Sequence, residues 1–194
     1  AQTKEIQYLS GKDKDHTVSW QFFCTGGRNS GYWTNIPVPS CWEQQGFGTY
    51  NYGRDYKTNG KNFRFADEKG IYKYNFSVPS SWKNKEVYLV FEGSMTDTEV
   101  MLNGKPAGDT HQGAFYRFKY NITGKLQFDK TNQLQATVSK MSADASVNNA
   151  ERLADYWIFG GIYRPVYLEA YPTQHITQLS IDAKADGNFK MDVS

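Results

Sequence analysis

The stretch Asp155-Tyr156-Trp157-Ile158-Phe159-Gly160-Gly161-Ile162-Tyr163-Arg164-Pro165-Val166-Tyr167-Leu168 holds the pattern that decides the fold: a Gly-Gly pair and then an aromatic, β-branched run. Glycines permit a positive φ or a close backbone approach, so a sharp turn is expected before a strand. That turn would hold Asp155 and Trp157 at the end of a sheet, where neither side chain need be buried. The alternative is a tight turn with Trp157 in the core, because Trp is mostly buried in proteins.

Strand patterns dominate the rest of the chain. Residues 72–78 alternate apolar and polar side chains, as a half-buried strand does. Residues 87–91 are apolar on both faces, which predicts a central strand of a sandwich. Residues 100–102 lead into Asn103-Gly104, a strong hairpin signal. Further alternation at 134–138 and 166–170, with one short helical segment around 144–153, predicts an all-β fold: a β-sandwich or jelly roll.

Composition narrows the classes of function. The chain has 194 residues, a formal net charge of +2 and 16% aromatic residues. This length fits one large domain, or one domain and a fragment. Because the basic residues form no stripe, no nucleic-acid partner is expected. Because no apolar run is long enough to span a bilayer, no membrane partner is expected.

The cysteines and histidines show no metal-ligand spacing. Cys24 and Cys41 are either two free thiols or a disulfide, and the sequence leaves both open. The histidines lie far apart, so no zinc site and no cofactor are predicted. A structural calcium ion would be compatible with a jelly roll, although no run of acids matches a calcium loop.

The C-terminal residues are expected to start a second unit. Tyr171-Pro172-Thr173 breaks the preceding strand, since proline disfavours its continuation. A hairpin follows over residues 176–193, with its turn at 185–188. A two-stranded hairpin is marginal alone. We therefore predict one domain over residues 1–172 and the beginning of another over 173–194, with the chain ending inside it.

Five motifs occur in a characteristic order. They are IPVPSCWE at 36–43, GIYKYNFSVP at 70–79, the hairpin from Phe91-Glu92-Gly93 to Val100-Met101-Leu102-Asn103-Gly104-Lys105, GDTHQG at 108–113 with Phe118, and GGIYRPV at 160–166. Together they resemble the N-terminal sugar-binding domain of the family 2 glycoside hydrolases, the β-galactosidase and β-glucuronidase group. The resemblance covers nearly all of residues 20–172.

The resemblance implies a jelly-roll domain followed by an immunoglobulin-like domain and a catalytic (β/α)₈ barrel. The family's two catalytic glutamates lie on the barrel, so no catalytic residue is expected in this chain. The implied function is that of a non-catalytic, sugar-binding domain of a retaining exo-glycosidase, β-galactosidase-like. Its implied partners are the terminal sugar of a β-glycoside and the enzyme's own other two domains. The implied location is periplasmic or extracellular.

The resemblance also implies substrate-binding residues. Asp155 and Trp157 match the family's Asp-x-Trp step, whose acid reaches into the barrel's active site and accepts hydrogen bonds from sugar hydroxyls. The family's Tyr-x-Asn segment corresponds to residues 49–56. Here Asn51 is one position early, so Asp55 or Arg54 could take its place. Arg164 is expected to pair with a carboxylate inside the domain.

Two other classes of function stay open. A free-standing carbohydrate-binding module would use exposed aromatic side chains, with Tyr32, Trp33, Tyr50 and Tyr52 as candidates. A structural or adhesive sandwich would instead pair Asp155 internally, with Arg152 or Arg164. A catalytic pair on Asp97 and Glu99 is disfavoured, because paired acids on a strand are usually a solvated face.

Overall fold

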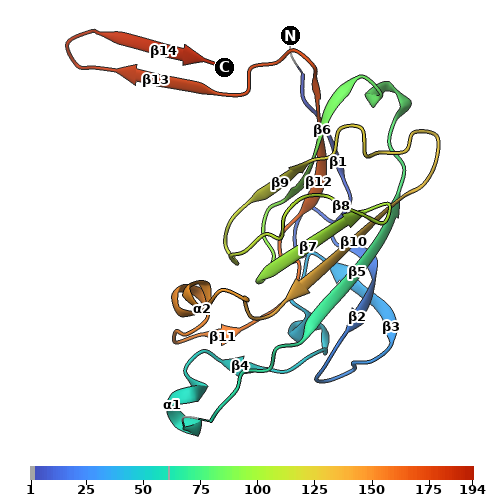
Figure 1. Ribbon diagram of the computed structural model, residues 1–194, viewed down its shortest axis with the longest axis vertical. Helices are drawn as coiled ribbons and strands as arrows, with labels where there is room; N and C mark the ends of the chain where they lie inside the picture. Colours follow the sequence, from blue (N-terminus) through green and yellow to red (C-terminus); the bar gives the residue numbers. More distant parts are fainter. Residues whose placement is uncertain (1–2, 61) are drawn as a thin grey trace.

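The chain forms a β-sandwich of two antiparallel sheets (Figure 1). The computed structural model describes residues 3–60 and 62–194. One sheet has four strands in the order β1-β12-β6-β9, and the other has six in the order β3-β2-β5-β10-β7-β8. The predicted all-β sandwich is confirmed.

The longer elements are strands, several of which have the alternating apolar and polar residues noted in the sequence. Their bounds are β1 (Glu5–Tyr8), β2 (Val18–Cys24), β3 (Trp33–Val38), β5 (Lys69–Phe76), β6 (Lys85–Phe91), β7 (Asp97–Leu102), β9 (Phe118–Asn121), β10 (Asn132–Ser139), β12 (Val166–Pro172), β13 (Leu179–Ala183) and β14 (Phe189–Val193). The short ones are η1 (Trp42–Gln45), β4 (Asn51–Tyr52), α1 (Asp55–Asn59), η2 (Ser80–Trp82), β8 (Lys105–Pro106), α2 (Ala145–Glu151) and β11 (Trp157–Ile158).

The core lies between the two sheets. Alternate residues of each strand face inward, because successive side chains of a strand point to opposite faces. Phe22 and Tyr72 from the six-stranded sheet are fully buried, as are Leu89 and Leu168 from the four-stranded sheet. Strand β6 lies between β12 and β9, which confirms the prediction that its doubly apolar sequence belongs to a central strand.

The predicted turn at Asn103-Gly104 and the predicted short helix are both present. Asn103 and Gly104 both have positive φ and join β7 to β8, as the Asn-Gly pair predicts. The helical segment is α2, whose N-cap Asp144 accepts a 2.7 Å hydrogen bond from the Ser146 amide. Over the described residues, no helix is both long and apolar enough to cross a membrane.

Two expectations about single residues were wrong, and one pair of alternatives that the sequence left open is decided. Arg164 is exposed and forms no ion pair within the described ranges; its guanidinium lies 5.0 Å from the Tyr163 ring. Asp97 is buried rather than solvated, because its Oδ2 accepts the amide of Ala143 at 2.8 Å. Cys24 and Cys41 are free thiols, so of the two alternatives the disulfide is wrong.

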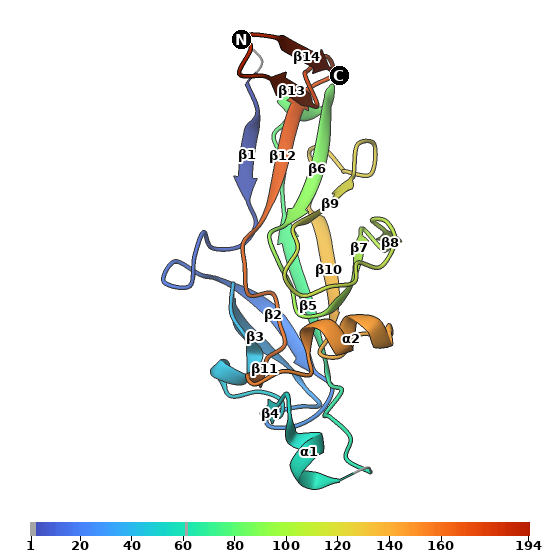
Figure 2. The same ribbon diagram turned by 90° about the vertical axis from the view of Figure 1, so that its left-hand side faces the viewer.

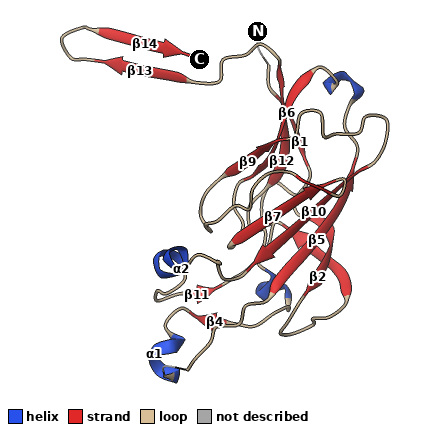
Figure 3. Ribbon diagram, in the orientation of Figure 1, coloured by secondary structure: helices blue, strands red, loops and turns tan. Residues whose placement is uncertain are grey.

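The two ends of the sandwich differ. The short β4-β11 sheet lies at one end together with α1 and α2, and the β13-β14 hairpin projects from the other end (Figures 1 and 2). Figure 3 shows that the short helices α1 and α2 gather beside β4 and β11, with a long loop connecting α1 to β5. This end therefore carries most of the irregular structure that can be shaped into a site.

Ion pairs cover the outer face of the four-stranded sheet. Glu169 of β12 is buried and accepts hydrogen bonds from Lys4 at 2.7 Å and Arg117 at 3.0 Å. Tyr171 donates to its other oxygen at 2.9 Å. Burial raises the pKa of Glu169, but the hydrogen bonds from Lys4 and Tyr171 outweigh it and hold this pKa below its usual value.

This network predicts acid sensitivity. Because the pKa of Glu169 is lower in the folded state, the unfolded chain binds more protons in acid. The stability that Glu169 contributes is therefore fully present above pH 4.5, the ordinary pKa of a glutamate, and is lost as the pH falls through the folded-state pKa. We expect Glu169→Gln to lower the free energy of unfolding at neutral pH, with a difference from wild type that shrinks on acidification. Urea denaturation at several pH values measures it; a difference independent of pH would contradict the assignment.

Candidate functional site

A small antiparallel sheet brings the two predicted sugar-binding segments together. Trp157 of β11 lies opposite Tyr52 of β4, and Ile158 lies opposite Asn51. The Trp157 ring packs edge-on against Tyr52, with centroids 5.6 Å apart, and against Tyr50 at 5.9 Å. Trp157 is 53% exposed, so the alternative of a core tryptophan is wrong. Three aromatic rings thus form an accessible platform.

Asp155 lies beside this platform with its carboxylate accessible. Its Oδ1 lies 2.5 Å from Nε of Arg54 and accepts a 3.3 Å hydrogen bond from the Tyr52 hydroxyl. The Asp155 side chain is nevertheless 63% exposed. The carboxylate is therefore oriented by two partners while its remaining lone pairs face solvent, where they can accept hydrogen bonds from a ligand.

A pocket of about 590 Å³ opens next to Asp155. Asp155, Tyr52 and Trp157 line it together with the apolar side chains of Met95 and Phe115. Most ligand pockets combine such an apolar lining with a few oriented polar groups. The arrangement suits a pyranose ring, whose C–H groups pack on aromatic faces while its hydroxyls donate to a carboxylate.

The Gly160-Gly161 turn fixes the approach to this pocket. A Cβ on Gly160 would lie 2.0 Å from Cζ2 of Trp42, and Gly161 has a φ of 127°. Both properties that the sequence indicated, close approach and positive φ, are present, one at each glycine. Side chains other than hydrogen are excluded at Gly160, so the turn packs directly on the buried indole of Trp42.

A buried charge cluster joins the two segments beneath the platform. The Lys140 ammonium is fully buried and lies 2.8 Å from Oε1 of Glu43 and 3.2 Å from Oε1 of Glu68. Glu43 accepts the Gly160 amide at 3.0 and 3.1 Å, and Glu68 accepts the Thr49 amide at 2.6 Å. Lys140 also donates to the Thr49 carbonyl. One ammonium therefore holds the backbone just before β4 and just after β11 through these two acids.

Burial also sets the protonation behaviour of groups around the pocket. It raises the pKa of Glu43, although the Lys140 ammonium partly opposes this. Burial raises the pKa of the Cys41 thiol to about 12, so Cys41 is a poor nucleophile at neutral pH. Cys41 therefore contributes to the pocket as a small apolar side chain.

Asn51 and Asp55 are held by the backbone of the same loop. Asn51 is 8% exposed and its Oδ1 accepts the Ala66 amide at 3.1 Å. Asp55, the first residue of α1, accepts the Tyr52 amide at 2.8 Å. The structure brings both residues near Asp155 through the β4-β11 pairing. In this conformation each makes a structural hydrogen bond, and whether either contacts sugar stays a prediction.

The arginines around the site occupy places that the sequence did not indicate. Arg54, suggested as a sugar contact, is the ion-pair partner of Asp155. Arg152 is fully buried and donates to the Phe159 carbonyl. The internal pairing of Asp155 with Arg152 or Arg164, expected for a purely structural sandwich, is not what the structure shows.

Sequence reasoning missed the supporting cluster. Lys140 directly follows the alternating strand β10, and Glu43 directly follows Trp42 in the motif at 36–43. The available signals were the position of Lys140, which continues the inward alternation of β10, and that of Glu43, which follows a large apolar residue. Nothing local indicated that Glu43, Glu68 and Lys140 meet, because they come from three distant parts of the chain.

The cluster generates a stability prediction. Lys140→Met leaves two buried carboxylates without their ammonium, and we expect a loss of about 3–5 kcal/mol in the free energy of unfolding, measured with urea. The control is Lys83→Met, which removes an exposed pair with Asp129 and costs at most about 1 kcal/mol. Adding Glu43→Gln to Lys140→Met should recover part of the loss. Equal losses of stability for Lys140→Met and Lys83→Met would contradict this account.

Comparisons with known proteins agree on one family. The family described as glycosyl hydrolases family 2, sugar binding domain, matches residues 29–172. A β-galactosidase of Priestia megaterium is 31% identical over 166 residues, which cover 81% of this chain and 16% of that protein. A β-galactosidase of Thermoanaerobacter pseudethanolicus is 33% identical over 116 residues, which cover 60% of this chain and 15% of that protein.

Solved structures share the fold. The β-glucuronidase of Bacteroides uniformis superimposes with a TM-score of 0.66 at 25% identity, over 98% of this chain and 22% of that one. The chain thus spans less than a quarter of the length of these relatives. The match to the family covers most of the sandwich, both β4 and β11, and the Gly-Gly turn. The chain therefore belongs to the sugar-binding domain family of the family 2 glycosyl hydrolases.

Proposed function

We propose that this chain is the non-catalytic sugar-binding domain of a retaining, β-galactosidase-like exo-glycosidase, and that Asp155 contributes to substrate binding in a catalytic barrel outside this chain. The observation that carries the proposal is the accessible carboxylate of Asp155, oriented by Arg54 and Tyr52 at the edge of a 590 Å³ pocket.

The chemistry assigned to Asp155 is hydrogen-bond acceptance. An ionised carboxylate accepts from sugar hydroxyls in charge-assisted hydrogen bonds, which are stronger than neutral ones. Trp157 and Tyr52 supply aromatic surface beside it for the sugar's C–H groups. In a retaining mechanism the two glutamates of the barrel perform the covalent steps, so Asp155 fixes the position of the terminal sugar and takes no part in proton transfer.

The β13-β14 hairpin supports the expected second domain. Leu179 lies opposite Val193, Ile181 opposite Met191 and Ala183 opposite Phe189, so one face of the hairpin is wholly apolar. Every residue of both strands is exposed, and the hairpin projects away from the sandwich (Figure 1). This apolar face supports the assignment of residues 173–194 to the first strands of an immunoglobulin-like domain, whose further strands would cover it.

The test is Asp155→Asn in the complete glycosidase. Loss of a charge-assisted hydrogen bond to the bound sugar should lower kcat/KM for a nitrophenyl β-galactoside roughly 10- to 100-fold. The matched control is Asp129→Asn, which changes an exposed acid paired with Lys83, in the loop between β9 and β10 and outside the lining of the Asp155 pocket. This control should leave kcat/KM unchanged.

Two results would overturn the proposal. One is an Asp155→Asn enzyme whose kcat/KM equals that of wild type, both for the nitrophenyl β-galactoside and for the corresponding nitrophenyl β-glucuronide. The other is turnover of such substrates by the 194-residue chain alone, since the barrel glutamates would then be dispensable. Circular dichroism of the variant chain shows whether the sandwich is intact, which separates a binding defect from unfolding.

A further inference from the structure

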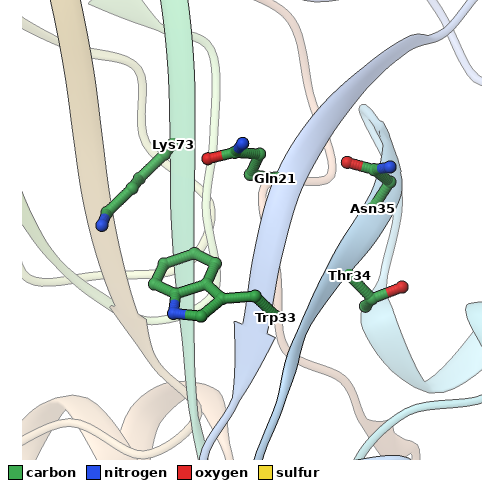
Figure 4. Close-up of a pocket in the computed structure, with 5 residues that line it drawn as sticks. All are labelled: Gln21, Trp33, Thr34, Asn35 and Lys73. Carbon is green, nitrogen blue, oxygen red and sulfur yellow. The ribbon is translucent and has the colours of Figure 1, made fainter.

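The outer face of the six-stranded sheet carries a second pocket, distinct from the one beside Asp155. Its volume is about 400 Å³ and its lining comes from β2, β3 and β5, with Trp33 and Lys73 as its largest side chains. Figure 4 shows the indole of Trp33 reaching from β3 across the sheet toward Lys73 on β5, while Thr34 points away from both. None of these residues lines the Asp155 pocket.

Strand register explains why these side chains meet. Gln21 of β2 lies opposite Asn35 of β3 on one side and Lys73 of β5 on the other, and Lys73 lies opposite Gln135 of β10. Side chains directly opposite one another in an antiparallel sheet lie on the same face. A row of three amides and one ammonium therefore crosses the outer face. Trp33, two residues before Asn35, stands beside that row.

Trp33 and Lys73 are arranged as binding groups. The core does not use the Trp33 indole, which is 47% exposed. The Lys73 ammonium lies 4.4 Å from the centre of this ring, in a cation–π contact that holds the charge in place. Among the described residues that line the pocket, Lys73 is the one that is charged, and no described acid forms an ion pair with it.

The outer face of the opposite sheet carries more ion pairs, although Lys119 there lies 4.4 Å from the Tyr88 ring in the same kind of contact and likewise has no ion pair among the described residues. There Lys4 and Arg117 are both paired with Glu169, and tyrosine hydroxyls complete the network. On the Trp33 face the ammonium lacks a carboxylate, and the amides of Gln21 and Asn35 are exposed. A ligand that carries both an anion and several hydroxyls could use the ammonium and these amides together.

We propose that the Trp33–Lys73 pocket binds an acidic sugar, a uronate residue of a glycan chain. The pyranose packs on the accessible part of the Trp33 indole, its carboxylate pairs with Lys73, and its hydroxyls bond to the amides of Gln21 and Asn35. The pocket is a surface site that retains glycan near the enzyme. It does not depend on the role proposed for Asp155, because the two pockets share no residues.

The experiment titrates the 194-residue chain with an oligogalacturonate and with a neutral galacto-oligosaccharide of matched length, following the Trp33 indole N–H signal by NMR. We expect the acidic probe to shift this signal and to bind more tightly than the neutral one. Because Trp33→Ala removes the reporting indole, its affinity is measured by isothermal titration calorimetry beside wild type, and binding should weaken about tenfold. Lys73→Gln should weaken binding of the acidic probe about fivefold and leave the neutral probe unaffected.

Two controls keep the result specific. Tyr32→Ala removes a neighbouring exposed ring outside the pocket lining, and Asp155→Asn alters the other site; both should bind the acidic probe as wild type does. A loss with Asp155→Asn would move the binding to the Asp155 pocket and overturn this proposal alone.

Three further outcomes would overturn it. They are the absence of any shift of the Trp33 signal at the highest soluble concentration, equal binding of both probes with no effect of Lys73→Gln, and a change in the sedimentation coefficient on Trp33→Ala. The last outcome would identify the face as a contact between protein chains.

Discussion

One buried ammonium between two carboxylates is the constraint on which the candidate site depends. Lys140 contacts Glu43 and Glu68, and these acids bind the amides of Gly160 and Thr49. Removing the ammonium would leave two buried carboxylates uncompensated, which is far costlier than losing a surface pair. The two segments that carry Tyr52 and Trp157 are therefore fixed relative to each other by electrostatics beneath them, and the aromatic platform inherits that geometry.

The surface above this cluster obeys different physics. The Arg54–Asp155 pair lies in contact with solvent, where ion pairs contribute little to stability. Its partners can therefore rearrange at small cost when a hydroxyl approaches the carboxylate. The backbone below it is held by the pairing of β4 with β11, beside which the Gly53 amide donates to the Tyr156 carbonyl at 2.9 Å. A binding site benefits from this combination. The fixed backbone orients the Asp155 carboxylate before a ligand arrives, and the exposed ion pair can exchange its partners for ligand hydroxyls at small cost.

Local patterns in the sequence were sufficient for the strands and turns. The alternation at 72–78, the doubly apolar run at 87–91 and the Asn103-Gly104 pair all predicted the elements that form. Long-range pairing was not predictable in the same way. Lys140 continues the inward alternation of β10, but its partners Glu43 and Glu68 are distant in sequence and no local pattern names them. Arg54 likewise became the partner of Asp155 only through the β4-β11 register, which no local pattern encodes. Helix α1 was missed because five residues carry too little periodicity.

The order of strands also bears on how the domain forms during synthesis. Strand β1 pairs with β12, so that Glu5 lies opposite Ala170 (Figure 2). Strand β1 must wait for β12, the last strand of the sandwich, before its backbone groups are satisfied, and such non-local pairing is slow. Meanwhile the edge of β1 stays available for wrong partners. Folding of this sandwich during synthesis is therefore completed by the pairing of β1 with β12, and until then β1 is the strand most open to wrong pairing.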